Sequence, residues 1–310
     1  MVATRPVVNR RTGGRFAAAA RTGDRSEAEG GSVGVILAFC SAIVYGCADF
    51  CGGKATRRAS AYTVTASSQL IGFTVVLVGL VVLPGRLTTH DLVLGALGGV
   101  GGGAGIMLLY HSLAHGTMSI VSPVTAVMAA IVPVVSGVAL FGERPSIPAF
   151  VGIGCSLLAI ALVSLSHDGG GRDGVGRSIL TAAAAGVCFG VFYVFLARCH
   201  DQAGLWPLVA ARPVSIGMAV AVARFNRASV LVPRDDWRLV APAGLMDMGA
   251  NVLYLFATHF GLLAVTGVLA SLYPVSTVAL AGTIDHERLR PVQWAGLVFA
   301  VLALVLIALK

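Results

Sequence analysis

The chain has 310 residues, of which 56% are hydrophobic and only 12% are charged, and its mean hydropathy is +0.86. About 25% of the residues of an ordinary soluble domain are charged, so this composition excludes a soluble globular enzyme. The formal net charge of +8 does not indicate nucleic-acid binding, because the arginines lie in an N-terminal tail and in short connections and form no basic face. We therefore predict a polytopic α-helical membrane protein with no nucleic-acid partner.

The N-terminal tail, residues 1–32, carries six arginines among Gly, Ala, Ser and Thr and has almost nothing to bury. We predict that this tail is disordered. Its positive charge favours a cytoplasmic N-terminus. In that orientation the arginines of the later connections lie on both sides of the membrane and do not decide the topology. The tail is therefore the only basis for our expectation that both termini are cytoplasmic.

Ten apolar segments follow the tail, and each is long enough to cross a hydrocarbon core about 30 Å thick. They cover residues 34–52, 61–83, 92–114, 118–141, 147–166, 178–198, 205–224, 238–259, 263–284 and 291–309. We predict an all-α membrane protein with ten transmembrane helices in the cytoplasmic membrane, surrounded by lipid bilayer.

A shift of 144 residues aligns the chain with itself and pairs Tyr110 with Tyr254 and His115 with His259. The chain then divides into the tail (1–32), a first five-helix repeat (33–166), a loop (167–177) and a second repeat (178–310). Because each repeat has an odd number of spans, the second must enter the membrane from the opposite side. Two inverted five-helix repeats are an architecture typical of secondary transporters.

Three charged side chains lie inside apolar segments, where a charge is costly and marks a functional candidate: Asp49, Arg212 and Asp247. The seventh and eighth segments run antiparallel, and their residue counts place Arg212 and Asp247 at similar depth. We favour an ion pair between them, which keeps Asp247 charged and gives it a structural role. The alternative is that Asp247 or Asp49 binds and releases protons and couples the protein to a proton gradient.

The eighth segment carries Asp247, Asn251 and Tyr254 on one helix face, and a polar face in a membrane helix lies against protein or water. We predict that these residues line a substrate cavity together with Tyr110 and His111 of the third segment. The alternatives are an interhelical hydrogen-bond network and, for His111, a packing histidine.

Prolines within the later segments of each repeat predict bends. Pro133 lies in the fourth segment and Tyr273-Pro274 in the ninth, so we predict gate or kink residues there. A static bend that only shapes the bundle is the alternative.

Glycines recur at every fourth residue in the third segment, at positions 95, 99 and 103. Such a series of small residues lets another helix approach closely. We therefore expect a close helix–helix contact along this face.

The sequence contains no pattern that predicts a metal site or an organic cofactor. Cys47 and Cys51 share a helix face, but no His or Cys partner with ligand spacing follows them. Nothing resembles an ATP-binding loop, which needs a preceding strand. We expect neither a metal nor a cofactor.

The ten-helix duplication, the run from Tyr45 to Gly53 and the Gly-Glu-Arg helix ends resemble the EamA-type drug/metabolite transporter superfamily over residues 34–309. In the second half Pro274 precedes Glu287 by thirteen residues, whereas in the first half Pro133 precedes Glu143 by ten. The resemblance implies a secondary transporter that moves a small metabolite, amino acid or drug through a cavity between the two halves by alternating access.

Two other functions remain open from the sequence. His111, Asp247 and Asp49 could supply acid and base for an intramembrane lipid-modifying enzyme, although they form no compact motif. A structural membrane protein without transport is the other alternative. The resemblance favours a protein that is not an enzyme.

Overall fold

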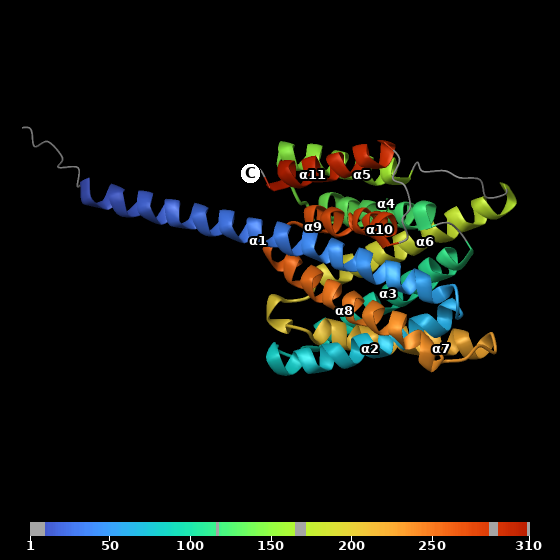
Figure 1. The fold of residues 1–310 in the computed structure, drawn as a ribbon. Helices are drawn as coiled ribbons and strands as arrows, with labels where there is room; N and C mark the ends of the chain where they lie inside the picture. Colours follow the sequence, from blue (N-terminus) through green and yellow to red (C-terminus); the bar gives the residue numbers. More distant parts are fainter. Residues whose placement is uncertain (1–9, 116–117, 165–171, 285–290, 309–310) are drawn as a thin grey trace, which may run out of the picture.

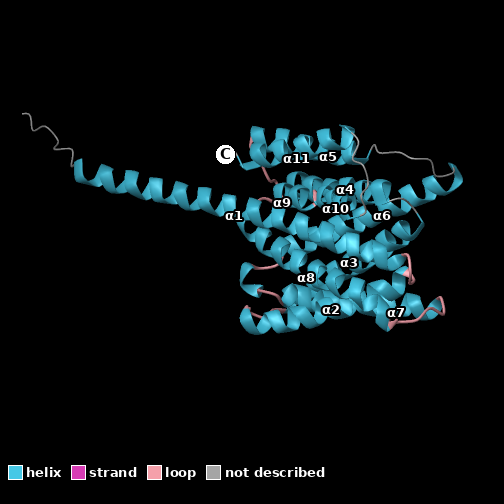
Figure 2. Ribbon diagram, in the orientation of Figure 1, coloured by secondary structure: helices cyan, strands magenta, loops and turns pink. Residues whose placement is uncertain are grey.

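The computed structural model describes residues 10–115, 118–164, 172–284 and 291–308, and it describes side chains, with gaps, from residue 31 onward. All regular structure in these ranges is helical (Figure 2), and the helices are joined by short loops. An all-α protein was predicted, and the structure agrees.

The helices of the first repeat are α1 (Arg10–Thr56), α2 (Ala61–Val82), α3 (Thr89–His115), α4 (Met118–Val135), the π-helix η1 (Ser136–Leu140) and α5 (Ile147–Ser164). Those of the second repeat are α6 (Arg172–Ala197), the 3₁₀ turn η2 (Asp201–Ala203), α7 (Trp206–Phe225), the 3₁₀ turn η3 (Arg234–Asp236), α8 (Trp237–Phe260), α9 (Leu263–Ala270), α10 (Tyr273–Ile284) and α11 (Pro291–Ala308).

Six helices in the described part of the chain are long and apolar enough to cross a membrane: α1 from Gly31, α2, α3, α6, α7 and α8. The other four predicted spans contain shorter apolar stretches of 10–17 residues. The fourth span changes to π-helical winding at Ser136, and the ninth is divided into α9 and α10 at Ser271 and Leu272. The protein is therefore a multi-pass membrane protein, with six clear spans and four shorter apolar helices in the part of the chain that the structure describes.

The first helix differs from the expectation for the N-terminal tail. α1 begins at Arg10, inside the segment predicted to be disordered, and projects from the bundle (Figure 1). The tail includes Ala17–Ala20 and several Arg and Glu residues, all of which have high helix propensity. The prediction of disorder considered only what the tail can bury and gave no weight to this propensity.

Helix packing follows a two-fold pattern. α1 packs against α8 as α6 packs against α3, and α3 packs against α7 as α8 packs against α2. α1 also contacts α10 as α6 contacts α4, while α2 meets α7 and α5 meets α11. In Figure 1 α1 runs from left to right and α6 from right to left. When the two repeats are exchanged, each of these contacts is replaced by its counterpart or by itself.

The glycine series of α3 lies directly against the backbone of α7. A Cβ atom at Gly99 would collide with the carbonyl oxygen of Ala211, and one at Gly103 would lie 2.8 Å from the Cβ of Ser215. This is the close helix approach that the series predicts. It brings the polar face of α7 to the centre of the bundle.

Candidate functional site

A cavity lies where the two repeats meet, and its empty space, which includes open solvent at its mouth, is about 560 Å³. It combines side chains from α1, α2 and α3 with side chains from α6, α7, α8 and α10. The lining residues are Tyr45, Asp49, Gln69, Gly99, Gly102, Gly103, Ile106, Phe189, Phe192, Tyr193, Ala211, Arg212, Ser215, Asp247, Asn251 and Tyr273.

One wall of the cavity carries an ion pair. Nη2 of Arg212 lies 2.9 Å from Oδ2 of Asp247, and only 6% and 15% of the two side chains are exposed. Arg212 is on α7 and Asp247 on α8, at the matched depth that the residue counts suggest. A buried carboxylate this close to a guanidinium has its charge neutralised locally.

Gln69 of α2 binds this ion pair and was not predicted from the sequence. Its Oε1 accepts hydrogen bonds from Nη1 of Arg212 and, at 3.1 Å, from Oγ of Ser215. Its Nε2 lies 3.5 Å from Oδ2 of Asp247. A signal was present: Gln69 is a polar residue inside the second apolar segment, beside Ser68, the repeat counterpart of Arg212.

Asp49 of α1 lines the same cavity without a partner. It is half-buried, and no hydrogen bond or ion pair joins its carboxylate to another residue in the described part of the chain. Tyr45 lies one turn earlier on the same face of α1. The cavity therefore holds one neutralised carboxylate and one unpaired carboxylate.

Aromatic rings form much of the remaining wall: Tyr45, Phe189, Phe192, Tyr193 and Tyr273. The centroids of Tyr45 and Tyr193 are 6.2 Å apart, and the hydroxyl of Tyr45 donates to Oδ1 of Asn251 at 2.9 Å. Tyr193 was missed from the sequence, although it is the residue that a shift of 144 pairs with Asp49.

Several residues predicted for the cavity lie behind or beyond its wall. Tyr254 is buried, its ring centroid is 4.3 Å from that of Tyr193, and its hydroxyl donates to the Tyr193 carbonyl at 3.4 Å. Tyr110 is buried beside Gly52 of α1. His111 is exposed on α3, with its ring 4.5 Å from that of His115, and does not line the cavity.

The predicted polar face of α8 is partly assembled. Asp247 and Asn251 both line the cavity, and Nδ2 of Asn251 donates to the carbonyl of Asp247 at 2.6 Å. Tyr254, the third member of that face, lies deeper in the protein. The polar face of α8 thus forms an interhelical hydrogen-bond network and also part of the cavity wall.

The predicted gate or kink residues lie at changes in helix geometry. Tyr273 is the first residue of α10 and lines the cavity. Its hydroxyl donates a hydrogen bond of 3.3 Å to the carbonyl of Ser122. Pro274 follows it, directly after the break between α9 and α10. Pro133 is buried against Gly267 of α9, three residues before the π-helix begins.

Glu143 follows η1 and contacts the start of α9. Its carboxylate oxygens accept hydrogen bonds from the backbone N–H groups of Leu263 at 2.8 Å and Ala264 at 3.0 Å. An anion at this place satisfies free donors at the N-terminus of α9 and interacts favourably with the helix dipole. The repeat counterpart, Glu287, lies outside the described residues.

The family model described as the EamA-like transporter family matches residues 32–165 and 176–309. The chain belongs to the EamA-like transporter family. The two matches to the EamA-like unit correspond to the two repeats, so the cavity lies between two EamA-like units. Membership of this family identifies a membrane transporter of the drug/metabolite transporter superfamily.

A comparison with solved structures supports the fold alone. A solved structure described as "Crystal structure of protein" is 18% identical to this chain, covers 88% of it and 95% of its own length, and has a TM-score of 0.70. No curated protein matches. The EamA-like helical arrangement is thus shared with a solved structure at low sequence identity.

Proposed function

We propose that the protein is a secondary transporter that exchanges a small organic cation with an apolar or aromatic body for protons across the cytoplasmic membrane. Ten spans in two inverted repeats would expose the central cavity alternately to each side. The observation that carries this proposal is the unpaired carboxylate of Asp49 in a cavity lined by aromatic rings.

The packing pattern supports alternating access. The largest helix contacts, such as α1 with α8 and α3 with α6, have counterparts in the other repeat, and the cavity lies where the repeats meet. Inverted repeats can exchange their conformations, which opens the same site first to one side and then to the other. The Arg-rich N-terminal tail supports an orientation with both termini in the cytoplasm.

The charge of the cavity favours a cationic substrate. Because Arg212 neutralises Asp247, the remaining charge is that of Asp49. Faces of Tyr, Phe and Trp rings attract cations as well. An anionic substrate would meet an unpaired carboxylate and the negative faces of the rings.

The same carboxylate can couple transport to protons. A carboxylate in a poorly hydrated site binds either a proton or a cationic ligand, and the two compete. We expect the proton-bound form and the substrate-bound form to change conformation, whereas the empty ionised form does not. Substrate then crosses the membrane in one direction while protons cross in the other. Facilitated diffusion is the alternative in which Asp49 binds substrate without exchanging protons.

Transport by the reconstituted protein tests the proposal. Liposomes with an acidic interior are given N-methylphenylpyridinium, whose charge is permanent, so that trapping as a weak base contributes nothing. We expect accumulation that needs the pH gradient, is absent in Asp49→Asn and is unchanged in Asp201→Asn, an exposed aspartate outside the cavity. Uptake of phenylpropionate in place of the cation, or uptake that survives Asp49→Asn, would contradict the proposal.

The alternative functions receive less support. An intramembrane lipid-modifying enzyme would need His111 close to Asp247 or Asp49, but His111 does not line the cavity and Asp247 is held by Arg212. A structural membrane protein would not need an unpaired carboxylate in its interior, which costs free energy without a compensating contact.

A further inference from the structure

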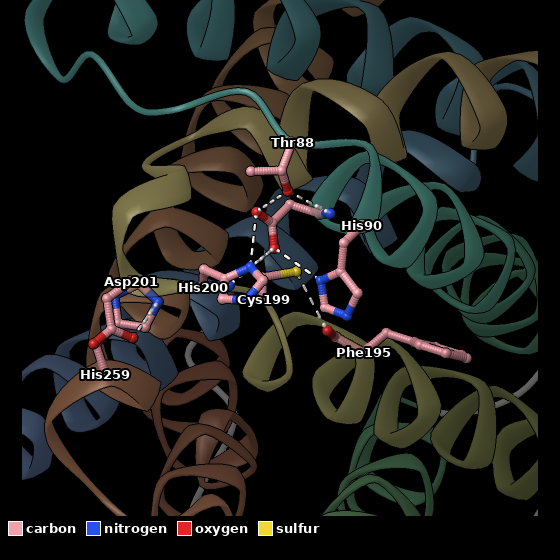
Figure 3. Close-up of polar contacts among 8 residues, drawn as sticks. Thr88, His90, Phe195, Cys199, His200, Asp201 and His259 are labelled. Carbon is pink, nitrogen blue, oxygen red and sulfur yellow. Dashed lines mark hydrogen bonds and ion pairs between the residues drawn. The ribbon is translucent and has the colours of Figure 1, made fainter.

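We propose that His90, Asp91 and His200 form a binding site for one divalent transition-metal ion such as Zn²⁺. The site lies at one end of the bundle, where the start of α3 meets the connection between α6 and α7 (Figure 3). None of the three residues lines the central cavity. The site is therefore separate from the central cavity.

The ligand atoms are separated as a metal ion requires. Nδ1 of His200 lies 3.1 Å and 3.2 Å from the two carboxylate oxygens of Asp91, and Nδ1 of His90 lies 3.4 Å from Oδ1. The three ligand atoms all lie within 4.8 Å of one another. In a tetrahedral zinc site with bonds near 2.1 Å, neighbouring ligand atoms are about 3.4 Å apart. A metal ion can thus replace the direct His–Asp contacts with little movement.

The carboxylate of Asp91 is held in place before any ion binds. Its side chain is fully buried, Oδ2 accepts a hydrogen bond of 2.6 Å from the hydroxyl of Thr88, and Oδ1 accepts one of 2.9 Å from the backbone N–H of His200. Partners of this kind orient a ligating carboxylate and strengthen metal binding. The two imidazoles are free to adjust, because 55% of His90 and 63% of His200 is exposed.

The fourth coordination position is open to water. Cys199 precedes His200, but its thiol donates to the carbonyl of Phe195 at 3.5 Å. Three protein ligands with an open fourth position are typical of an accessible, exchangeable zinc site.

The donor set favours zinc-like ions over magnesium or calcium. Two imidazole nitrogens suit Zn²⁺, Ni²⁺ and Cu²⁺, whereas Mg²⁺ and Ca²⁺ prefer oxygen ligands only. His200 lies 109 residues from Asp91 in the sequence. Ligand spacing along the chain therefore gave no indication of the site, which joins the two repeats.

Zinc binding to the tag-free, detergent-purified protein tests the proposal. Zn²⁺ is titrated against a chromophoric chelator in excess Mg²⁺, for the wild type and for the double variant His90→Gln/His200→Gln. Both side chains are largely exposed, so the variant should fold, whereas Asp91 is avoided because its buried carboxylate also contacts the helix-capping Thr88. The matched control is His111→Gln/His115→Gln, which removes the other histidine pair of α3.

We expect one zinc ion per chain in the wild type and in the control, and affinity lowered at least about tenfold in His90→Gln/His200→Gln. Zn²⁺ should also raise the thermal midpoint of the wild type and the control but not that of the double variant. Equal zinc affinity in the double variant and the wild type, or loss of binding only in the control, would overturn the proposal.

Discussion

Asp49 and Asp247 line one cavity, yet their surroundings give them different tasks. Asp247 contacts Arg212 at 2.9 Å and lies beside Gln69, whereas Asp49 has no ionic or hydrogen-bonding partner in the described part of the chain. The contrast shows that the partners of a buried charge decide whether its role is structural or functional. A paired carboxylate stabilises the bundle, and an unpaired one remains available to ligand and proton.

The largest effect should come from Asp49→Asn. We expect gradient-driven accumulation of N-methylphenylpyridinium to fall to the level of protein-free liposomes, because the amide neither binds a proton nor carries charge. Thermal stability should not fall, since no partner is lost and the amide removes an uncompensated interior charge. A variant that keeps most of its accumulation would remove the distinction between the two carboxylates.

Arg212→Met would convert Asp247 into a second unpaired carboxylate. We expect the free energy of unfolding to fall by about 3 to 5 kcal/mol, because a buried charge loses its partner. The thermal midpoint in detergent measures this loss. The double variant Arg212→Met/Asp247→Leu should recover most of it, and a double variant as unstable as the single one would argue against the ion pair.

Gln69→Leu tests the support of the ion pair from α2. The substitution removes the acceptor of Arg212 and of Ser215, and we expect a loss of about 1 to 3 kcal/mol in thermal unfolding. Ser215→Ala removes only one of these hydrogen bonds and should cost less. Equal losses in the two variants would show that the hydrogen bond from Arg212 to Gln69 adds nothing to stability.

The smallest effect is expected for Tyr45→Phe. This variant loses the hydrogen bond to Asn251 but keeps the ring beside Asp49, so stability should fall by only about 0.6 kcal/mol. Cation affinity should remain close to that of the wild type, as measured by equilibrium binding. Tyr45→Ala removes the ring as well, and unchanged affinity in that variant would contradict a role for the aromatic wall.

The sequence predicted those features that depend on position along a helix. The shift of 144 residues predicted the repeats, and counting residues from a shared connection placed Arg212 and Asp247 at one depth. Both inferences need only the rise per residue.

Which side chains reach the cavity depends on how each helix is rotated and how it packs, and the sequence did not predict this. Tyr110 and His111 were both expected at the cavity, but adjacent residues point about 100° apart on a helix, and neither of these two lines the cavity. The structure places Tyr110 inside the bundle and His111 at its surface. Gln69 and Tyr193 reach the cavity only because α2 and α6 turn these faces inward.

Proton release on binding tests the central claim most directly. N-methylphenylpyridinium is added to the purified protein in weakly buffered solution, at a pH where part of the protein is protonated, and the released protons are titrated. We predict release from the wild type and from Asp247→Asn, and none from Asp49→Asn. Release that persists in Asp49→Asn and disappears in Asp247→Asn would contradict the assignment of the exchanging carboxylate.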